Sequence, residues 1–75
     1  MYKMRVLVKL PRVKQFFGKD AQWVQQEHEA QDFRHCLPAL ESCLKNRLHN
    51  VEICLRFPDE RYDVTIPLDL AAIDN

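Results

Sequence analysis

Residues 51–68 of the chain read VEICLRFPDERYDVTIPL, and this stretch predicts a β-hairpin. Two runs in which apolar and polar side chains alternate flank a turn signal at residues 58–61. If Phe57 pairs with Tyr62, apolar residues face apolar ones and a cation faces an anion, a match that a slip by one residue destroys. The further pairs in this register are Leu55–Val64, Ile53–Ile66, Val51–Leu68, Arg56–Asp63 and Cys54–Thr65.

A second strand is predicted over residues 2–10, where apolar and polar side chains also alternate. One face carries Tyr2, Met4, Val6, Val8 and Leu10, and the other carries Lys3, Arg5, Leu7 and Lys9. If this strand shares a sheet with the hairpin, one face of the sheet is partly charged. We expect that face to collect Lys3, Arg5 and Lys9 with Glu52, Arg56 and Asp63.

The segments between these strands predict helices. Pro11 suits a first helical position and Gly18 a stop, so residues 11–17 are expected to form a short helix. Asp20 can cap a helix over residues 20–33, although residues 22–28 can instead form an edge strand. A third helix is predicted over residues 37–48, because its apolar residues recur at helical spacing. These are Leu37, Leu40, Leu44 and Leu48.

The element order therefore predicts an α+β fold, β-α-(α)-α-β-β, that ends in a hairpin and carries its helices on one face of the sheet. A ubiquitin-like β-grasp is the alternative, with residues 22–28 as its second strand. At 75 residues and 8.9 kDa, residues 1–75 form one domain. Residues 69–75 are expected to be a tail that docks or frays. A domain of this size buries only about 60% of its unfolded surface, so a partner would add useful stability.

The composition argues against several classes of enzyme. With one glycine, Gly18, the chain cannot build a glycine-rich phosphate loop, and Ser42 lacks the glycines that flank a strained nucleophile turn. No catalytic residue and no cofactor is therefore predicted. Three cysteines without a short-spaced framework indicate reduced thiols, and the N-terminal residues do not resemble a signal peptide. We expect a cytoplasmic protein without membrane helices.

Metal and thiol chemistry have weak support. The best metal-ligand spacing is His28, Asp32 and Cys36, which would require an unbroken helix, and no metal site is predicted. Cys54 is the cysteine whose register turns it away from the helices, and a packing role is favoured over a reactive one.

The zero net charge conceals an uneven distribution. Residues 1–19 carry six basic side chains and no acid, so the rest of the chain holds five basic and eleven acidic ones. The basic residues are Lys3, Arg5, Lys9, Arg12, Lys14 and Lys19. They form a candidate surface for anions, and a nucleic-acid-binding protein is the alternative function.

The favoured function is a small, non-enzymatic intracellular protein-interaction module, accessory or regulatory, that acts as a homodimer. The chain has seven aromatic residues, more than a core of this size readily hides. Trp23 and Phe33 are the predicted partner contacts. The expected partner is another protein or a second copy of the chain.

Overall fold

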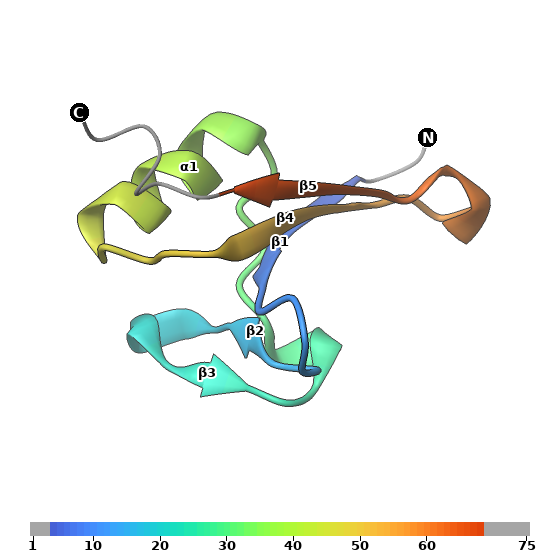
Figure 1. The fold of residues 1–75 in the computed structure, drawn as a ribbon. Coiled ribbons are helices and arrows are strands. Elements are labelled where there is room, and N and C mark those ends of the chain that lie inside the picture. Colours follow the sequence, from blue (N-terminus) through green and yellow to red (C-terminus); the bar gives the residue numbers. More distant parts are fainter. Residues whose placement is uncertain (1–3, 69–75) are drawn as a thin grey trace.

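The computed structural model describes residues 4–68, which form one antiparallel sheet and one α-helix (Figure 1). The strands lie in the order β3-β2-β1-β4-β5. The elements are β1 (Arg5–Lys9), β2 (Phe16–Phe17), β3 (Trp23–Val24), α1 (Cys36–Lys45), β4 (Val51–Arg56) and β5 (Val64–Leu68), with 3₁₀ turns η1 (Lys19–Ala21), η2 (Glu27–Glu29) and η3 (Glu60–Tyr62). The coarse prediction of an α+β fold is confirmed, and the predicted tail 69–75 lies outside the described residues.

The C-terminal hairpin has the predicted register. Within the ladder, Val51 pairs with Leu68, Ile53 with Ile66 and Leu55 with Val64. The turn includes η3, and the side chain of Asp59, the residue before it, accepts a hydrogen bond from the Arg61 N–H. Phe57 and Tyr62 lie outside the ladder, because Phe57 N–H donates to the Asp63 side chain at 2.8 Å.

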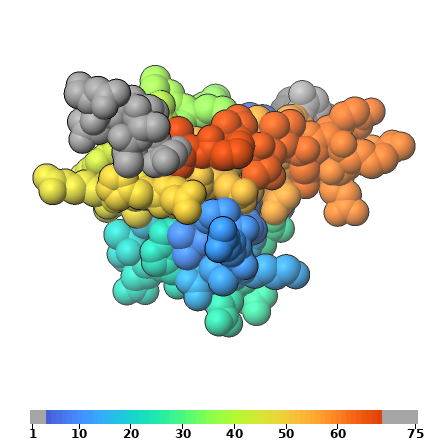
Figure 2. Space-filling view, in the orientation of Figure 1, coloured from blue at the N-terminus to red at the C-terminus, as the bar shows by residue number. Residues whose placement is uncertain are grey.

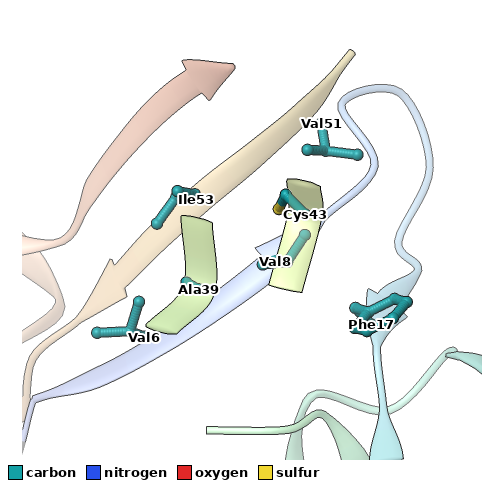
Figure 3. Packing of buried hydrophobic residues seen from close by; sticks show 7 residues of the cluster. All are labelled: Val6, Val8, Phe17, Ala39, Cys43, Val51 and Ile53. Atoms are coloured by element: carbon teal, nitrogen blue, oxygen red, sulfur yellow. The ribbon is translucent and has the colours of Figure 1, made fainter. Parts of the chain in front are cut away.

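The first strand is confirmed over residues 5–9 and lies between β2 and β4. The side chains of this strand alternate between two separate hydrophobic cores, one on each face of the sheet. Val6 and Val8 face α1, whereas Leu7 packs with Phe16 and Cys54 on the opposite side. Figure 3 shows Val6 and Val8 beneath Ala39 and Cys43 of the helix. The sheet is therefore buried on both faces near β1.

The predicted helix over residues 11–17 is wrong. Residues 10–15 form a turn in which Leu10 N–H donates to the Gln15 carbonyl at 3.0 Å, and the chain returns as β2. The physical reason lies in Phe16 and Phe17, which are both buried but belong to the two different cores. Adjacent residues point to opposite faces only in a strand, so both rings are buried by extended backbone.

The predicted helix over residues 20–33 is also wrong. The segment contains η1, η2 and the edge strand β3, and β3 lies within the alternative strand proposed for residues 22–28. The chain then folds back along β2, where Gln31 N–H donates to the Phe17 carbonyl and Gly18 bridges Ala30. These long-range bonds replace the helical ones that a weak apolar stripe would not have stabilised.

The finer topology differs from both predictions. Three strands precede α1 and two follow it among the described residues, so the predicted order β-α-(α)-α-β-β does not hold. The ubiquitin-like alternative takes residues 22–28 as its second strand, whereas here β2 comes between β1 and β3, the strand within that segment.

The third predicted helix forms as α1, but it is rotated relative to the expected core face. Its buried residues are Ala39 and Cys43, whereas Leu37 and Leu44 are 64% and 54% exposed. The small side chains let the helix backbone approach Val6 and Val8 closely, which larger residues would prevent. Part of the predicted leucine stripe therefore stays in solvent.

Candidate binding surfaces

The predicted charged face forms as expected, and its charges are paired with one another. Cross-strand neighbours Lys9 and Glu52 approach to 3.6 Å. Arg5 lies opposite Arg56, a pair of like charges that would repel. Glu27, from η2, lies between them, 3.4 Å from Arg5 and 2.8 Å from Arg56. Lys3, the sixth predicted member, lies outside the described residues.

A polar cleft of about 720 Å³ lies where this network meets the hairpin turn. Arg56 also contacts Asp63 at 3.2 Å, and Asp59 pairs with Arg61 at 2.7 Å. Contact with the Arg61 guanidinium lowers the pKa of Asp59. Each of these carboxylates is paired with an arginine, which suits a structural network better than acid–base catalysis.

The two aromatic residues predicted to contact a partner pack largely inward. Trp23 meets Phe17 edge to face, with ring centroids 5.4 Å apart. Phe33 N–H donates to the Val6 carbonyl at 2.9 Å, and Phe33 packs against the core beneath α1. The structure brings both residues to the same core cluster, each half-buried.

An exposed apolar surface lies elsewhere, on the flank formed by β5 and α1. We call it the β5–α1 surface, and its members are Leu37, Leu44, Tyr62, Val64 and Ile66. Tyr62 is 65% exposed, and Val64 and Ile66 are 43% and 40% exposed. Figure 2 shows β5 in orange to red across the molecule, with α1 in green at its rim.

Register places Val64 and Ile66 on the side of the sheet that carries α1, the helix of Leu37 and Leu44. The β4 partners of Val64 and Ile66 are Leu55 and Ile53, which belong to the core beneath α1. On α1, Pro38 and Ser42 line a hollow beside Phe17 of β2, and the exposed Leu37 and Leu44 lie on the side of the helix away from both this hollow and the buried Ala39 and Cys43. An apolar hollow of about 560 Å³ continues the surface past Tyr62 to Phe57.

Sequence reasoning missed this surface because it assigned these residues to the core. One signal was available. The strand VTIPL carries no charge and ends the sheet, whereas natural edge strands are commonly protected by charged residues.

The remaining predicted cations divide between two places. Lys19 lies on η1. Arg12 and Lys14 are exposed in the turn after β1, and the pairing of Lys9 with Glu52 places this turn beside the connection between α1 and β4. Figure 3 shows that turn close to Val51.

Two further cations lie where α1 ends and this connection begins. Lys45 and Arg47 are exposed, and Arg47 adopts the left-handed conformation with φ 53°. We call Arg12, Lys14, Lys45 and Arg47 the basic end. None of these four takes part in an ion pair among residues 4–68.

The structure gives no support to the weaker candidates. In the described part of the chain no three His, Cys, Asp or Glu side chains gather as metal ligands, and residues 28–36 are not one helix. Asp32 instead accepts hydrogen bonds from the N–H groups of Val6 and Arg34. Burial raises the pKa of Cys54 despite the opposing effect of Arg56, so its thiol is a poor nucleophile at neutral pH.

The chain was compared with protein-family models, curated proteins and solved structures, and none of them matches it. Within residues 4–68, no helix has both the length and the apolar character needed to cross a membrane.

Proposed function

We propose that this domain is a non-enzymatic protein-interaction module, accessory or regulatory, that binds a second copy of itself through the β5–α1 surface. The observation that carries the proposal is the exposure of five large apolar side chains on β5, η3 and α1, with Val64 and Ile66 on the face of the sheet that carries the helix. Scattered apolar residues are ordinary on protein surfaces, whereas a contiguous group is typical of a contact site.

The energetics favour a partner that covers the whole surface. Completing the burial of a half-exposed Val, Leu or Ile contributes about 1 kcal/mol. Four aliphatic side chains and Tyr62 from each copy contribute on the order of 10 kcal/mol to a dimer, comparable to the estimated entropic cost of association. Covering one or two of them would therefore not hold two molecules together, and the flank must act as a unit.

A second copy fits this surface for two reasons. Its apolar residues are self-complementary, as a twofold interface requires. The chain also carries no net charge, so two copies approach without overall repulsion. Dimerisation would in turn stabilise a domain of only 75 residues.

Sedimentation equilibrium over a range of micromolar concentrations tests the proposal, with Val64→Lys as the interface variant. Val13→Lys is the matched control, because Val13 is 49% exposed in the turn after β1 and outside the surface. We expect the wild-type chain and Val13→Lys to dimerise equally. Val64→Lys should weaken the dimer by about tenfold or more, because it places a charge in an apolar contact.

Two results would overturn the proposal. One is a wild-type chain that remains monomeric to hundreds of micromolar. The other is a dimer that Val64→Lys and Val13→Lys weaken to the same degree. Circular dichroism of each variant establishes that it is folded at the concentrations used.

The basic end supports a second candidate function, binding of nucleic acid through its phosphates. Four exposed cations, from the turn after β1 and from the end of α1 and the connection that follows it, have no ion pairs of their own in the described chain. Contact with four phosphates predicts an affinity that falls with a logarithmic salt slope of roughly −3 to −4.

Fluorescence anisotropy with labelled single- and double-stranded DNA tests this candidate at several salt concentrations. Arg12→Glu should weaken binding and reduce the slope, whereas Lys19→Glu, outside the basic end, should not. Absence of binding to either DNA at low salt would exclude this function.

A further inference from the structure

The hydrogen bonds of β1 determine which backbone groups of β5 point away from the sheet. Val6 N–H donates to the Asp32 carboxylate at 3.0 Å, and the Val6 carbonyl accepts from Phe33 N–H at 2.9 Å. Both backbone groups of Val6 therefore point away from β4. In an antiparallel ladder this makes Val6 and its partner Leu55 a non-hydrogen-bonded pair, so the Leu55 groups point towards β5.

The same alternation continues across the hairpin. Leu55 and Ile53 exchange hydrogen bonds with Val64 and Ile66. Thr65 and Pro67 lie between these bonded positions, so their backbone groups point to the free edge of the sheet. Pro67 has no N–H, which is the position where a sheet tolerates proline.

Thr65 is consequently the main donor on that edge. The N–H of Asp63, the next residue with this orientation, already donates to the Glu60 carbonyl at 3.1 Å. Over residues 63–67, Thr65 supplies the one outward N–H that lacks a partner in the hairpin. The free edge of β5 therefore offers a partner strand one N–H donor, at Thr65, with a carbonyl acceptor on each side of it.

We infer that the second copy pairs its own β5 antiparallel to this one, about a twofold axis at Thr65, so that one sheet runs through both copies. The inference rests on the proposed function and specifies how the two copies meet. In this register Thr65 and its symmetry-related Thr65 exchange two hydrogen bonds, N–H to carbonyl in each direction. Both outward groups of Thr65 are then satisfied.

Neighbouring registers are less favourable. A shift that centres the axis on Ile66 places Thr65 opposite Pro67, which has no N–H to give to the Thr65 carbonyl. A shift that centres it on Val64 places Thr65 opposite Asp63, whose N–H is occupied in the turn. The two positions without a free donor therefore select the Thr65-centred register.

Side-chain chemistry agrees with this register. It places Val64 opposite Ile66 of the second copy and Ile66 opposite Val64, two apolar cross-strand pairs on the face that carries α1. A twofold axis perpendicular to the sheet keeps both helices on that face, so the flanks that carry Leu37 and Leu44 face each other. No charged side chain of β5 opposes the pairing, since the strand reads VTIPL.

Amide hydrogen exchange of the unmodified chain tests the inference at a low and a high protein concentration. The Thr65 N–H should exchange freely in the monomer and become protected in step with the dimer fraction. The amide of Lys14, in the exposed turn, should exchange equally at both concentrations. Sedimentation of the same samples gives the dimer fraction.

A pair of variants tests the hydrogen bonds. Thr65→Pro removes the outward N–H and leaves the β4 ladder, to which this N–H does not contribute, whereas Thr65→Val keeps it. We expect the dissociation constant of Thr65→Pro to exceed that of Thr65→Val by about tenfold or more, as two lost backbone bonds imply.

The outcomes distinguish a failure of the edge pairing from a failure of the proposed dimerisation. A dimer in which the Thr65 amide stays unprotected would overturn the edge pairing and leave a dimer formed by another part of the β5–α1 surface. A chain that never dimerises would overturn both. If Thr65→Pro unfolds, the exchange experiment on the wild-type chain still decides the matter.

Discussion

Arg56 donates from Nε to Oε1 of Glu27 at 2.8 Å, although the two residues are 29 positions apart in the chain. This contact ties η2 to β4 and separates Arg56 from Arg5, its like-charged cross-strand neighbour. The bond therefore removes a repulsion as well as adding an attraction. It also fixes a segment, η2, that buries no residue of its own.

Replacing Glu27 with Gln should lower the free energy of unfolding by about 1 kcal/mol, because the bridging charge is lost while the side-chain shape is kept. The effect stays small because the Glu27 side chain is 38% exposed and water screens the pair. Glu29→Gln, on the same turn but exposed, is the control and should change little. Urea denaturation of both variants measures the difference, and equal losses would contradict this role for Glu27.

The three thiols should react at very different rates. Cys36 is exposed, whereas Cys43 and Cys54 are buried and burial raises the pKa of both. Because the thiolate is the reactive form, iodoacetamide should modify Cys36 first and the other two on the order of tenfold or more slowly at neutral pH. Mass spectrometry of the partly modified chain identifies the sites. Rapid modification of Cys54 in the folded chain would contradict its burial and revive a reactive role.

The buried thiols also predict a loss of stability in alkaline solution. A thiol whose pKa is raised in the folded state stays protonated there, while it ionises near its ordinary value of 9.0 in the unfolded chain. The stabilising contribution is thus complete below about pH 8 and is lost as the pH rises towards the folded pKa. Chemical denaturation from pH 7 to 10.5 should show this decline. Cys43→Ala should make it less steep, and an unchanged slope would exclude Cys43 as a cause.

The single glycine should resist substitution for a reason of space. A methyl group on Gly18 would lie 3.0 Å from Cγ1 of Val24 and 3.1 Å from the Gln22 carbonyl oxygen. The backbone cannot easily retreat, because Gly18 N–H donates to that same carbonyl at 2.7 Å. Gly18→Ala should therefore cost about 1–3 kcal/mol by overpacking, measured by thermal or urea unfolding. An Ala variant as stable as the wild type would show that β2 and β3 can separate locally.

The sequence predicted the register of the C-terminal hairpin, apart from the Phe57–Tyr62 pair at its turn, because its information is local. Apolar and charged pairs such as Ile53–Ile66 and Arg56–Asp63 repeat in one register, and one turn separates them. The charged face followed from the same alternation. The residues predicted for it within the described chain do lie together.

The segment between the strands was not predictable in this way. β2 and β3 are two residues long, too short to display a period. They are held by partners distant in sequence, such as the bond from Gln31 N–H to the Phe17 carbonyl. The bridging role of Glu27 likewise depends on where this segment folds, and no spacing in the chain indicates it.

The orientation of α1 gives the sharpest contrast between sequence pattern and structure. A core stripe through Leu44 would make Leu44→Ala cost about 2–5 kcal/mol, whereas its 54% exposure predicts a loss within about 0.5 kcal/mol. Ala39, which the stripe omits, is fully buried against β1, so Ala39→Leu should overpack the core and cost about 1–3 kcal/mol.

Urea denaturation of both α1 variants, at concentrations where the chain is monomeric, separates the two orientations. The opposite ranking, with Leu44→Ala more damaging than Ala39→Leu, would mean that the helix turns its leucines to the core. The β5–α1 surface would then lose its helical half. The ranking therefore decides whether two of the five residues assigned to the dimer contact are free to make it.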